Sequence, residues 1–388
     1  MITLQDKKPF LIFGSPLIGE ADIEEVVATL RSGWLGTGPK VKRFEEMFRD
    51  YTGAKHAMAV NSCTAALHLS LLVSGVGPGD EVITSPMTFC ATANAILHAG
   101  ATPVFADVDF RTMNLDPKAA EAAITPRTRA ILPIHLAGRP CDLDAIGKLA
   151  ARHGLLVIED AAHCIEGRYH GRKIGAVSAL TCFSFYVTKN LVTGEGGMVT
   201  TDNPELAAKI KMYGLHGMSA DAWHRFSDKG YKHYEVVFPG FKYNMMDIQA
   251  ALGIHQLPRL ERQWARRDAI WQRYDDAFSD LPIGTPAPQE PDTMHARHLY
   301  TVLIEKERCG KTRDEVLMGL HELGIGTGIH YTALHLHRYY RERFGYQQGD
   351  FANAERIGAA TLSLPLSAKL TDEDVTRVID GLYHVLRN

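Results

Sequence analysis

Short apolar segments of strand length alternate with amphipathic helical segments from about residue 20 to residue 250. Repeated strand–helix–strand units join parallel strands through right-handed crossovers, and helices then cover both faces of the sheet. The sequence therefore predicts an α/β fold with a mainly parallel central sheet. The expected strands cover residues 81–84, 102–106, 130–134 and 155–158, and the expected helices cover residues 91–99, 117–123 and 142–153.

Polar residues follow three of the expected strands. Asp107, His135 and Asp160 each come directly after an apolar segment. Ligands of open α/β sheets bind beyond the carboxyl ends of the strands. We therefore expect chemistry near these three side chains.

The chain is long enough for two domains. Its 388 residues exceed the length that one hydrophobic core usually serves. A helical stretch at 248–278, with a break at Pro258, and a proline-rich linker at 284–291 separate two differently patterned parts. We expect an N-terminal arm at 1–20, a large α/β domain at 21–250 and a smaller α+β domain at 251–388. The expected elements of the smaller domain are a strand at 298–305 and helices at 312–323 and 371–386.

Composition excludes several classes of protein. Hydrophobic residues make up 45% of the chain and charged residues 22%, and the net charge is -3. These values are typical of a globular enzyme, and they give no electrostatic reason to expect nucleic acid or a membrane as a partner. The N-terminal residues lack the apolar core of a signal peptide, so we expect a cytoplasmic protein. The six cysteines form no CxxC pair and the histidines no HExxH pattern, so we expect no metal site.

The most informative pair of residues is Asp160 and Lys189. Asp160 ends an apolar strand, and Lys189 lies among aromatic and hydroxyl residues before a glycine-rich turn. Pyridoxal phosphate (PLP) needs an amine that binds its aldehyde and a carboxylate that keeps its ring nitrogen protonated. Phe183 and Phe185 suggest an apolar setting, which would lower the pKa of the lysine. Two plainer interpretations stay open, a helix-capping role for Asp160 and a surface position for Lys189.

A second segment suits a phosphate group. Residues 61–68 read as a strand end that turns into a helix, with Ser62, Cys63 and Thr64 at the turn. The first backbone N–H groups of a helix point outward at the positive end of its dipole, where they bind anions. An ordinary serine or threonine N-cap is the alternative.

The same segments resemble the DegT/StrS family of PLP-dependent sugar aminotransferases. The resemblance implies an α/β PLP-dependent transferase fold of type I, which is the aspartate aminotransferase-like fold. Several independent motifs carry it in the order in which they occur in the family. The matching blocks are residues 32–34 with 37–39, 61–66, 79–83, 158–163, 183–197, 240–244 and 326–331.

The resemblance implies a role for each matching residue around PLP. Lys189 is the catalytic residue, which binds PLP covalently and moves the proton during catalysis, with pyridoxamine phosphate as the intermediate form of the cofactor. Asp160 pairs with the ring nitrogen, His163 lies near the phenolic oxygen, and Phe89 stacks on the ring. The phosphate donors are Cys63, Thr64 and Ser184, joined by Asn244 from the neighbouring subunit of a homodimer.

Other residues are expected at the substrate. Tyr186 stands where many relatives have histidine, so the fit to the sugar is altered while catalysis is retained. His330 and Tyr331 lie where relatives contact a sugar nucleotide, although a packed strand is the alternative. Trp34 and Thr37 are expected to shape the substrate entrance, and a buried tryptophan in a structural turn is the alternative for Trp34.

The resemblance implies a two-step transamination. L-glutamate donates its amino group, and a 4-keto nucleotide sugar accepts it. A UDP-linked 4-keto pentose is the expected acceptor, as in the synthesis of 4-amino-4-deoxy-L-arabinose for lipid A modification in lipopolysaccharide. A 4-keto-6-deoxyhexose linked to UDP, GDP or dTDP and a 3-keto sugar are alternatives, and so is a non-catalytic regulator that binds PLP or a sugar nucleotide. A sugar dehydratase of the same fold is disfavoured because it has histidine in place of Lys189.

Overall fold

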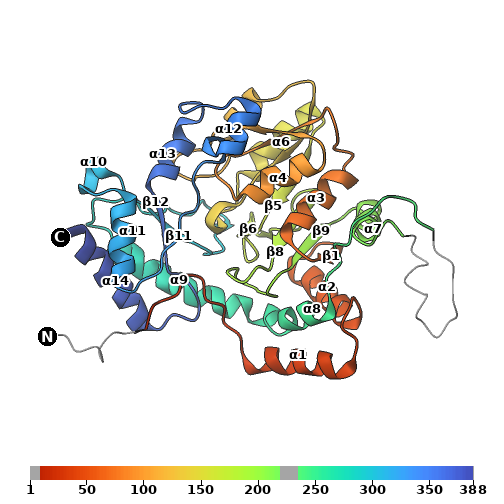
Figure 1. Ribbon diagram of the computed structural model, residues 1–388, viewed down its shortest axis with the longest axis horizontal. Helices are drawn as coiled ribbons and strands as arrows, with labels where there is room; N and C mark the ends of the chain where they lie inside the picture. Colours follow the sequence, from red (N-terminus) through yellow and green to blue (C-terminus); the bar gives the residue numbers. More distant parts are fainter. Residues whose placement is uncertain (1–8, 219–234, 388) are drawn as a thin grey trace.

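The computed structural model of the chain describes residues 9–218 and 235–387. A seven-stranded sheet lies at its centre, with strand order β1-β9-β8-β5-β4-β2-β3 (Figure 1). The pairs β2–β3, β2–β4, β4–β5 and β5–β8 are parallel, whereas β9 is antiparallel to both β1 and β8. The sheet is therefore mixed and mainly parallel, which confirms the predicted fold class. Its strands are β1 (His56–Val60), β2 (Glu81–Thr84), β3 (Thr102–Phe105), β4 (Thr128–Leu132), β5 (Leu156–Asp160), β8 (Leu180–Ser184) and β9 (Gly197–Thr201).

Two hydrophobic cores cover the two faces of this sheet. On one face, α2 (Pro39–Thr52), α5 (Pro117–Ala122), α6 (Leu143–His153) and α8 (Asp247–Ile254) pack around the buried rings of Phe44, Phe48, Phe183 and Phe185. On the other face, α3 (Cys63–Val73), α4 (Cys90–His98) and α7 (Pro204–Tyr213) pack through leucine, alanine and valine side chains. Helices on both faces bury the strands of a sheet almost completely, and β2, β4 and β9 are buried along nearly their whole length.

The C-terminal part of the chain has its own core. The second half of α9 (Leu260–Ala277) packs against α11 (Arg313–Glu322), α14 (Asp372–Arg387) and the pair β11 (Tyr300–Leu303) and β12 (Thr361–Leu364). In Figure 1 this part, drawn in blue, lies beside the central sheet, and the N-terminal segment runs along it. Leu11 forms a β-bridge with Ile325, and the Arg377 guanidinium of α14 donates to the Pro9 carbonyl at 2.8 Å, so the N-terminal segment is attached to the C-terminal part. The division into an arm and two domains stays a prediction, and position 250 falls inside α8.

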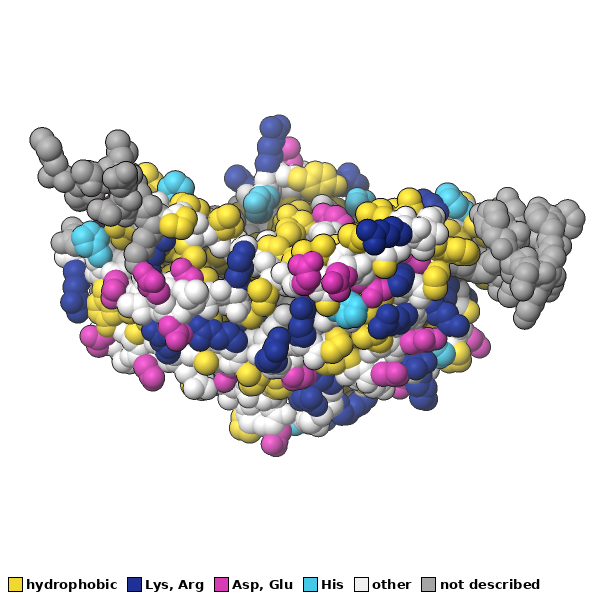
Figure 2. Space-filling model, turned by 90° about the horizontal axis from the view of Figure 1, so that it is seen from below, with side chains coloured by type: hydrophobic (Ala, Val, Ile, Leu, Met, Phe, Trp, Pro, Cys, Tyr) yellow, Lys and Arg dark blue, Asp and Glu magenta, His cyan; other side chains and the backbone are white. Residues whose placement is uncertain are grey.

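The remaining elements are short or peripheral. They are α1 (Glu20–Ser32), β6 (Arg168–Tyr169), β7 (Arg172–Lys173), β10 (Thr293–Met294), α10 (Lys306–Cys309), α12 (Arg338–Phe344) and α13 (Ala352–Ala360). The helical stretch predicted at 248–278 is interrupted by the 3-10 turn Leu257–Arg259, which confirms the break at Pro258. Within the described residues no helix is long and apolar enough to cross a membrane. On the side seen in Figure 2, Lys, Arg, Asp and Glu side chains are interspersed with hydrophobic ones.

Candidate active site

A cavity of about 580 Å³ opens at the carboxyl ends of the parallel strands. Strands β5 and β8 end at its wall with Asp160 and Ser184, and α3 begins there. The N-terminal segment and the loop after α11 close the other side through Phe13 and Gly328. Ten of the sequence-predicted site residues line this one cavity. They are Cys63, Thr64, Phe89, Asp160, His163, Ser184, Tyr186, Lys189, His330 and Tyr331.

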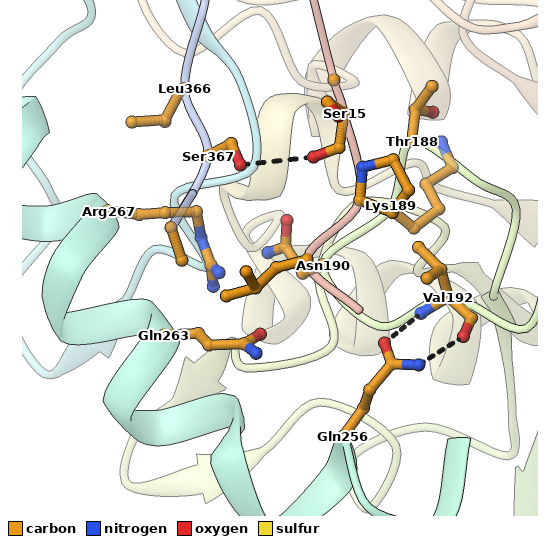
Figure 3. A pocket seen from close by; sticks show the side chains of 14 residues that line it. Ser15, Thr188, Lys189, Asn190, Val192, Gln256, Gln263, Arg267, Leu366 and Ser367 are labelled. Atoms are coloured by element: carbon orange, nitrogen blue, oxygen red, sulfur yellow. Dashed lines mark hydrogen bonds between the residues drawn. The ribbon is translucent and has the colours of Figure 1, made fainter. Parts of the chain in front are cut away.

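Lys189 lies in the connection between β8 and β9, and its backbone N–H donates to the Tyr186 carbonyl at 2.9 Å. Burial lowers the pKa of its ammonium group from 10.5 to about 8, against the opposing effects of Cys63 and Asp160. A lysine that loses its proton near neutral pH can act as a nucleophile and as a base. A small cavity of about 30 Å³ lies on the other side of the Lys189 segment and separates it from α9 (Figure 3).

Asp160 is a buried carboxylate, 5% exposed, with both oxygens occupied. Oδ2 accepts from the Thr92 hydroxyl at 2.8 Å, and Oδ1 accepts from the Ala162 N–H at 3.1 Å. Burial raises the pKa of this carboxyl group, and these two hydrogen bonds oppose the rise. A cation placed against Asp160 would lower the pKa again, so the site suits a protonated ring nitrogen. Asp160 does not cap a helix, which excludes the plainer interpretation of this residue.

The first turn of α3 lies at one end of the cavity. The Ser62 side chain caps the helix by accepting from the Ala65 N–H at 3.1 Å. Cys63 and Thr64 follow in the first turn and line the cavity, where their N–H groups have no intrahelical partner. Gly197 at the start of β9 lies against the backbone of Ser62, and a Cβ atom at this position would be 2.6 Å from the Ser62 carbonyl carbon. The close approach of β9 therefore depends on glycine.

Two neutral aromatic side chains meet at the far wall. The Ala137 N–H donates to His163 Nδ1 at 3.3 Å, and His163 Nε2 lies 3.3 Å from the Tyr331 hydroxyl. Burial and the nearby charge of Lys189 keep the pKa of His163 well below 6.5. His163 therefore carries its proton on Nε2, where it can donate toward the cavity.

His330 and Tyr331 lie in a loop and not in a strand, so the packed-strand interpretation is wrong. Burial lowers the pKa of His330 to about 4, and its Nδ1 lies 2.8 Å from the Ser363 hydroxyl. Phe89 and Tyr186 expose 59% and 44% of their surfaces, which leaves two aromatic faces available at the cavity mouth.

Three predicted residues lie elsewhere. Trp34, Thr37 and Asn244 line a second cavity of about 450 Å³ between α2, β1 and the end of α7. Asn244 Nδ2 donates to the Thr37 hydroxyl at 2.6 Å, while its buried Oδ1 has no partner among the described residues. Trp34 is 51% exposed, so the alternative of a buried tryptophan is wrong.

The expectation of chemistry at Asp107 and His135 is wrong. Asp107 accepts from the N–H groups of Asn353 and Ala354 at 3.0 Å each, so it caps α13 instead. His135 is fully buried and lies 2.6 Å from Glu159, away from the cavity. A strand end therefore indicates the correct edge of the sheet, but the packing of later elements decides which side chain is open there.

The sequence analysis missed Thr92 and His298, which both line the cavity. Thr92 was detectable, because it follows Phe89 by three residues in a helix and therefore shares its face. His298 gave no such signal, since it reaches the cavity through the docking of residues 296–299 on residues 137–138.

Comparison with known proteins identifies the family. Residues 16–383 match the model of the DegT/DnrJ/EryC1/StrS aminotransferase family. The chain belongs to this family. It is 52% identical over 386 residues to the spore coat polysaccharide biosynthesis protein SpsC of Bacillus subtilis, with 99% of each chain covered.

Solved structures agree with this assignment. The putative sugar aminotransferase Spr1654 from Streptococcus pneumoniae, PMP-form, matches with a TM-score of 0.90 at 35% identity, over 97% of this chain and 98% of that one, and a PLP-form is similar. Helicobacter pylori PseC, an aminotransferase involved in the biosynthesis of pseudaminic acid, matches with a TM-score of 0.90 at 30% identity. The match covers 98% of this chain and all of PseC, at 100%. The expected type I fold and a PLP-dependent sugar aminotransferase are thereby confirmed.

The residues of the cavity fit PLP. Lys189 supplies an amine of lowered pKa, Asp160 a buried carboxylate, and α3 a set of N–H donors for a phosphate. Gly197 lets β9 pack closely against the backbone of Ser62 and Cys63 at the start of α3. When bound, PLP supplies an electron sink for the substrate carbon that exchanges a proton.

Proposed function

We propose that the enzyme transfers the amino group of L-glutamate to the ketone of a 4-keto nucleotide sugar. The observation that carries this proposal is the joint presence of Lys189, Asp160 and the α3 N-terminus in one cavity. The family membership and the sugar aminotransferase relatives support an amino-group transfer to a sugar. Each transfer needs a proton to move between two carbon atoms, and Lys189 is the cavity base whose pKa suits this task.

Within the proposed site the sequence-predicted cavity residues divide the tasks among them. Lys189 binds PLP and moves the proton, Asp160 holds the ring nitrogen protonated, and His163 donates from Nε2. Cys63, Thr64 and Ser184 hold the phosphate, and Phe89 covers the ring. Tyr186, His330 and Tyr331 line the cavity and contact the sugar.

The nucleotide sugar is proposed at the level of a class. The named relatives act in spore coat polysaccharide and pseudaminic acid biosynthesis, so they favour a polysaccharide or glycan precursor. They give no support to the 4-keto pentose of aminoarabinose synthesis or to a lipid A role. A UDP-linked 4-keto-6-deoxyhexose is therefore the acceptor that we test first.

A product assay tests this proposal. The purified enzyme is incubated with nitrogen-15-labelled L-glutamate and, separately, with a UDP-4-keto-6-deoxyhexose, a UDP-4-keto pentose and a 3-keto nucleotide sugar. Mass spectrometry of the nucleotide sugar should detect the label in the 4-keto-6-deoxyhexose product. Label in none of the sugars would refute transfer to any of these three acceptors, and label in the pentose or the 3-keto sugar alone would refute the acceptor proposed here.

A homodimer completes the proposed site. Ile23, Val27 and Leu30 form an apolar stripe at helical spacing along α1, Trp34 follows the end of this helix, and each of the four is at least 36% exposed. Trp34 lines the second cavity, where the unpartnered Asn244 Oδ1 also lies. A second copy that covers the stripe would bring Asn244 to the phosphate end of the neighbouring site.

Subunit mixing tests the shared site. In the proposed dimer each active site takes Lys189 from one subunit and Asn244 from the other. A hybrid of one Lys189→Ala subunit and one Asn244→Ala subunit therefore has both substitutions in one site and an intact second site. Mixing the two inactive variants should restore part of the activity. A dimeric protein whose mixed variants stay inactive would contradict the exchange of Asn244.

A further inference from the structure

His298 is a cavity residue to which the proposed function assigns no task. It lies just before β11, is 6% exposed and lines the cavity beside Lys189. Its backbone N–H donates to the Ala137 carbonyl at 3.2 Å. Its ring packs on the ring of His163 with a centroid distance of 4.5 Å. The same residue, Ala137, therefore positions both histidines, since its N–H also holds His163 Nδ1.

Asn190, the residue after Lys189, fixes the tautomer of His298. The two hydrogens of Asn190 Nδ2 point to Glu166 Oε2 at 2.8 Å and to the Ala296 carbonyl at 3.2 Å, and both of these groups only accept. The amide oxygen must therefore face His298, and Oδ1 lies 2.9 Å from Nδ1. Because an amide oxygen cannot donate, Nδ1 of His298 carries a proton.

A buried ion pair holds Asn190 in this orientation. Glu166 is fully buried and pairs with Arg267 of α9, whose Nε also donates to the Arg297 carbonyl at 3.0 Å. In Figure 3 the Arg267 side chain reaches from α9 toward Asn190. The contact with Arg267 holds the Glu166 carboxylate in place, so its Oε2 continues to orient the Asn190 amide.

Nε2 of His298 is left as an open acceptor. Among the described residues no group forms a hydrogen bond with Nε2. This atom is not sealed inside the protein, so it is accessible from the cavity that His298 lines. Burial, together with the positive charges of Lys189 and Arg267, keeps the pKa of His298 well below 6.5. The ring is neutral at physiological pH, with its lone pair on Nε2.

We propose that His298 Nε2 accepts a hydrogen bond from a hydroxyl group of the sugar and so helps to determine sugar specificity. The inference rests on the proposed function. A carboxylate of glutamate cannot donate a hydrogen bond, and the lone pair of Nε2 would repel it. The ammonium group of Lys189 would repel a second ammonium group. A sugar hydroxyl is a neutral donor, so neither repulsion applies to it. An acceptor in a buried site rejects an analogue that lacks the matching donor, because the acceptor is then left unpaired.

The tautomer can be tested without substrate. Nuclear magnetic resonance of protein labelled with nitrogen-15 histidine reports which ring nitrogen carries the proton, and loss of one signal set in His298→Gln assigns it. We expect a proton on Nδ1 only between pH 6 and 8, and the Asn190→Leu variant should lose this preference. A proton on Nε2 in the unmodified protein would overturn the proposal.

The two half-reactions test the ligand. The absorption of bound PLP is followed first with L-glutamate and then with the UDP-4-keto-6-deoxyhexose as the probe. His298→Leu should raise the KM for the sugar roughly tenfold, the effect of one lost hydrogen bond, and leave the glutamate half-reaction within about twofold. His298→Gln, which retains an acceptor, should recover most of the loss, and His295→Leu controls for the loss of a nearby buried histidine.

The outcomes separate this proposal from the proposed function. Equal losses in both half-reactions would overturn the assignment to the sugar, because His298 would then act on PLP or Lys189. If the unmodified enzyme does not use the UDP-4-keto-6-deoxyhexose, the proposed sugar substrate is refuted. The tautomer measurement would still show whether His298 Nε2 is free to accept a hydrogen bond.

Discussion

Replacing Lys189 by methionine should stabilise the cofactor-free protein at neutral pH while abolishing transamination. Burial lowers the pKa of Lys189 from 10.5 to about 8. At roughly 1.4 kcal/mol per pH unit, this lowering corresponds to about 3 kcal/mol of folding free energy spent on the buried ammonium group. Methionine has a similar length and no charge, so Lys189→Met removes that cost.

The pH dependence distinguishes this effect from simple hydrophobic packing. Below pH 8 Lys189 is charged in both the folded and the unfolded state, and the full cost is present. Between about pH 8 and 10.5 the folded state binds fewer protons than the unfolded state, so the stability of the unmodified protein rises with pH. The advantage of Lys189→Met should therefore be greatest below pH 8 and decline by about 3 kcal/mol toward pH 10.5.

Urea denaturation of the PLP-free proteins at a series of pH values measures this difference. Comparing the two proteins at each pH cancels the titration of other groups. Lys148→Met, which changes an exposed lysine on α6, is the matched control and should show little pH-dependent gain. A stability difference for Lys189→Met that does not change with pH would refute the argument that burial lowers the pKa of this lysine.

Three further predictions follow from the same site. Asp160→Asn should lower kcat by roughly a hundredfold or more, as removal of a transition-state electrostatic contact does, and a circular dichroism spectrum like that of the unmodified enzyme would show that the fold is retained. Gly197→Ala should weaken PLP binding at least tenfold, because the new Cβ would lie 2.6 Å from the Ser62 carbonyl carbon and displace the start of α3. Titration of the cofactor-free protein with PLP measures this affinity, and an unchanged affinity would contradict the role of the α3 N-terminus in binding the phosphate. Thr92→Val should lower kcat by about tenfold through loss of its 2.8 Å hydrogen bond to Asp160, with kinetics as the assay, and an unchanged kcat would show that this bond is dispensable.

Local sequence patterns predicted the sheet and the cavity edge well. The strand expected at 81–84 is β2, and the one at 155–158 is β5, extended by two residues to Asp160. Lys189 and Asp160 were predicted because their chemistry is rare in an apolar setting. The strand end that turns into a helix at residues 61–68 is also found, since β1 ends at Val60 and α3 begins at Cys63.

Long-range packing decided the features that local patterns missed. Asp107 follows a strand as a site residue would, but its carboxylate accepts a hydrogen bond from the first turn of α13. Trp34, Thr37 and Asn244 lie in family-like motifs of their own, and within one chain they line a different cavity from the other predicted residues. His298 reaches the cavity only because residues far away in sequence dock on the loop after β4. None of these outcomes follows from the pattern around the residue itself.

The central claim is that one cavity carries an amino group from glutamate to a nucleotide sugar through Lys189-bound PLP. The most direct test is the visible absorption spectrum of the purified enzyme with PLP, recorded after L-glutamate and again after the UDP-4-keto-6-deoxyhexose. The account predicts that glutamate removes the absorption of bound PLP and that the sugar restores it, with neither change in Lys189→Ala. Absorption that persists after glutamate in the unmodified enzyme would contradict the account.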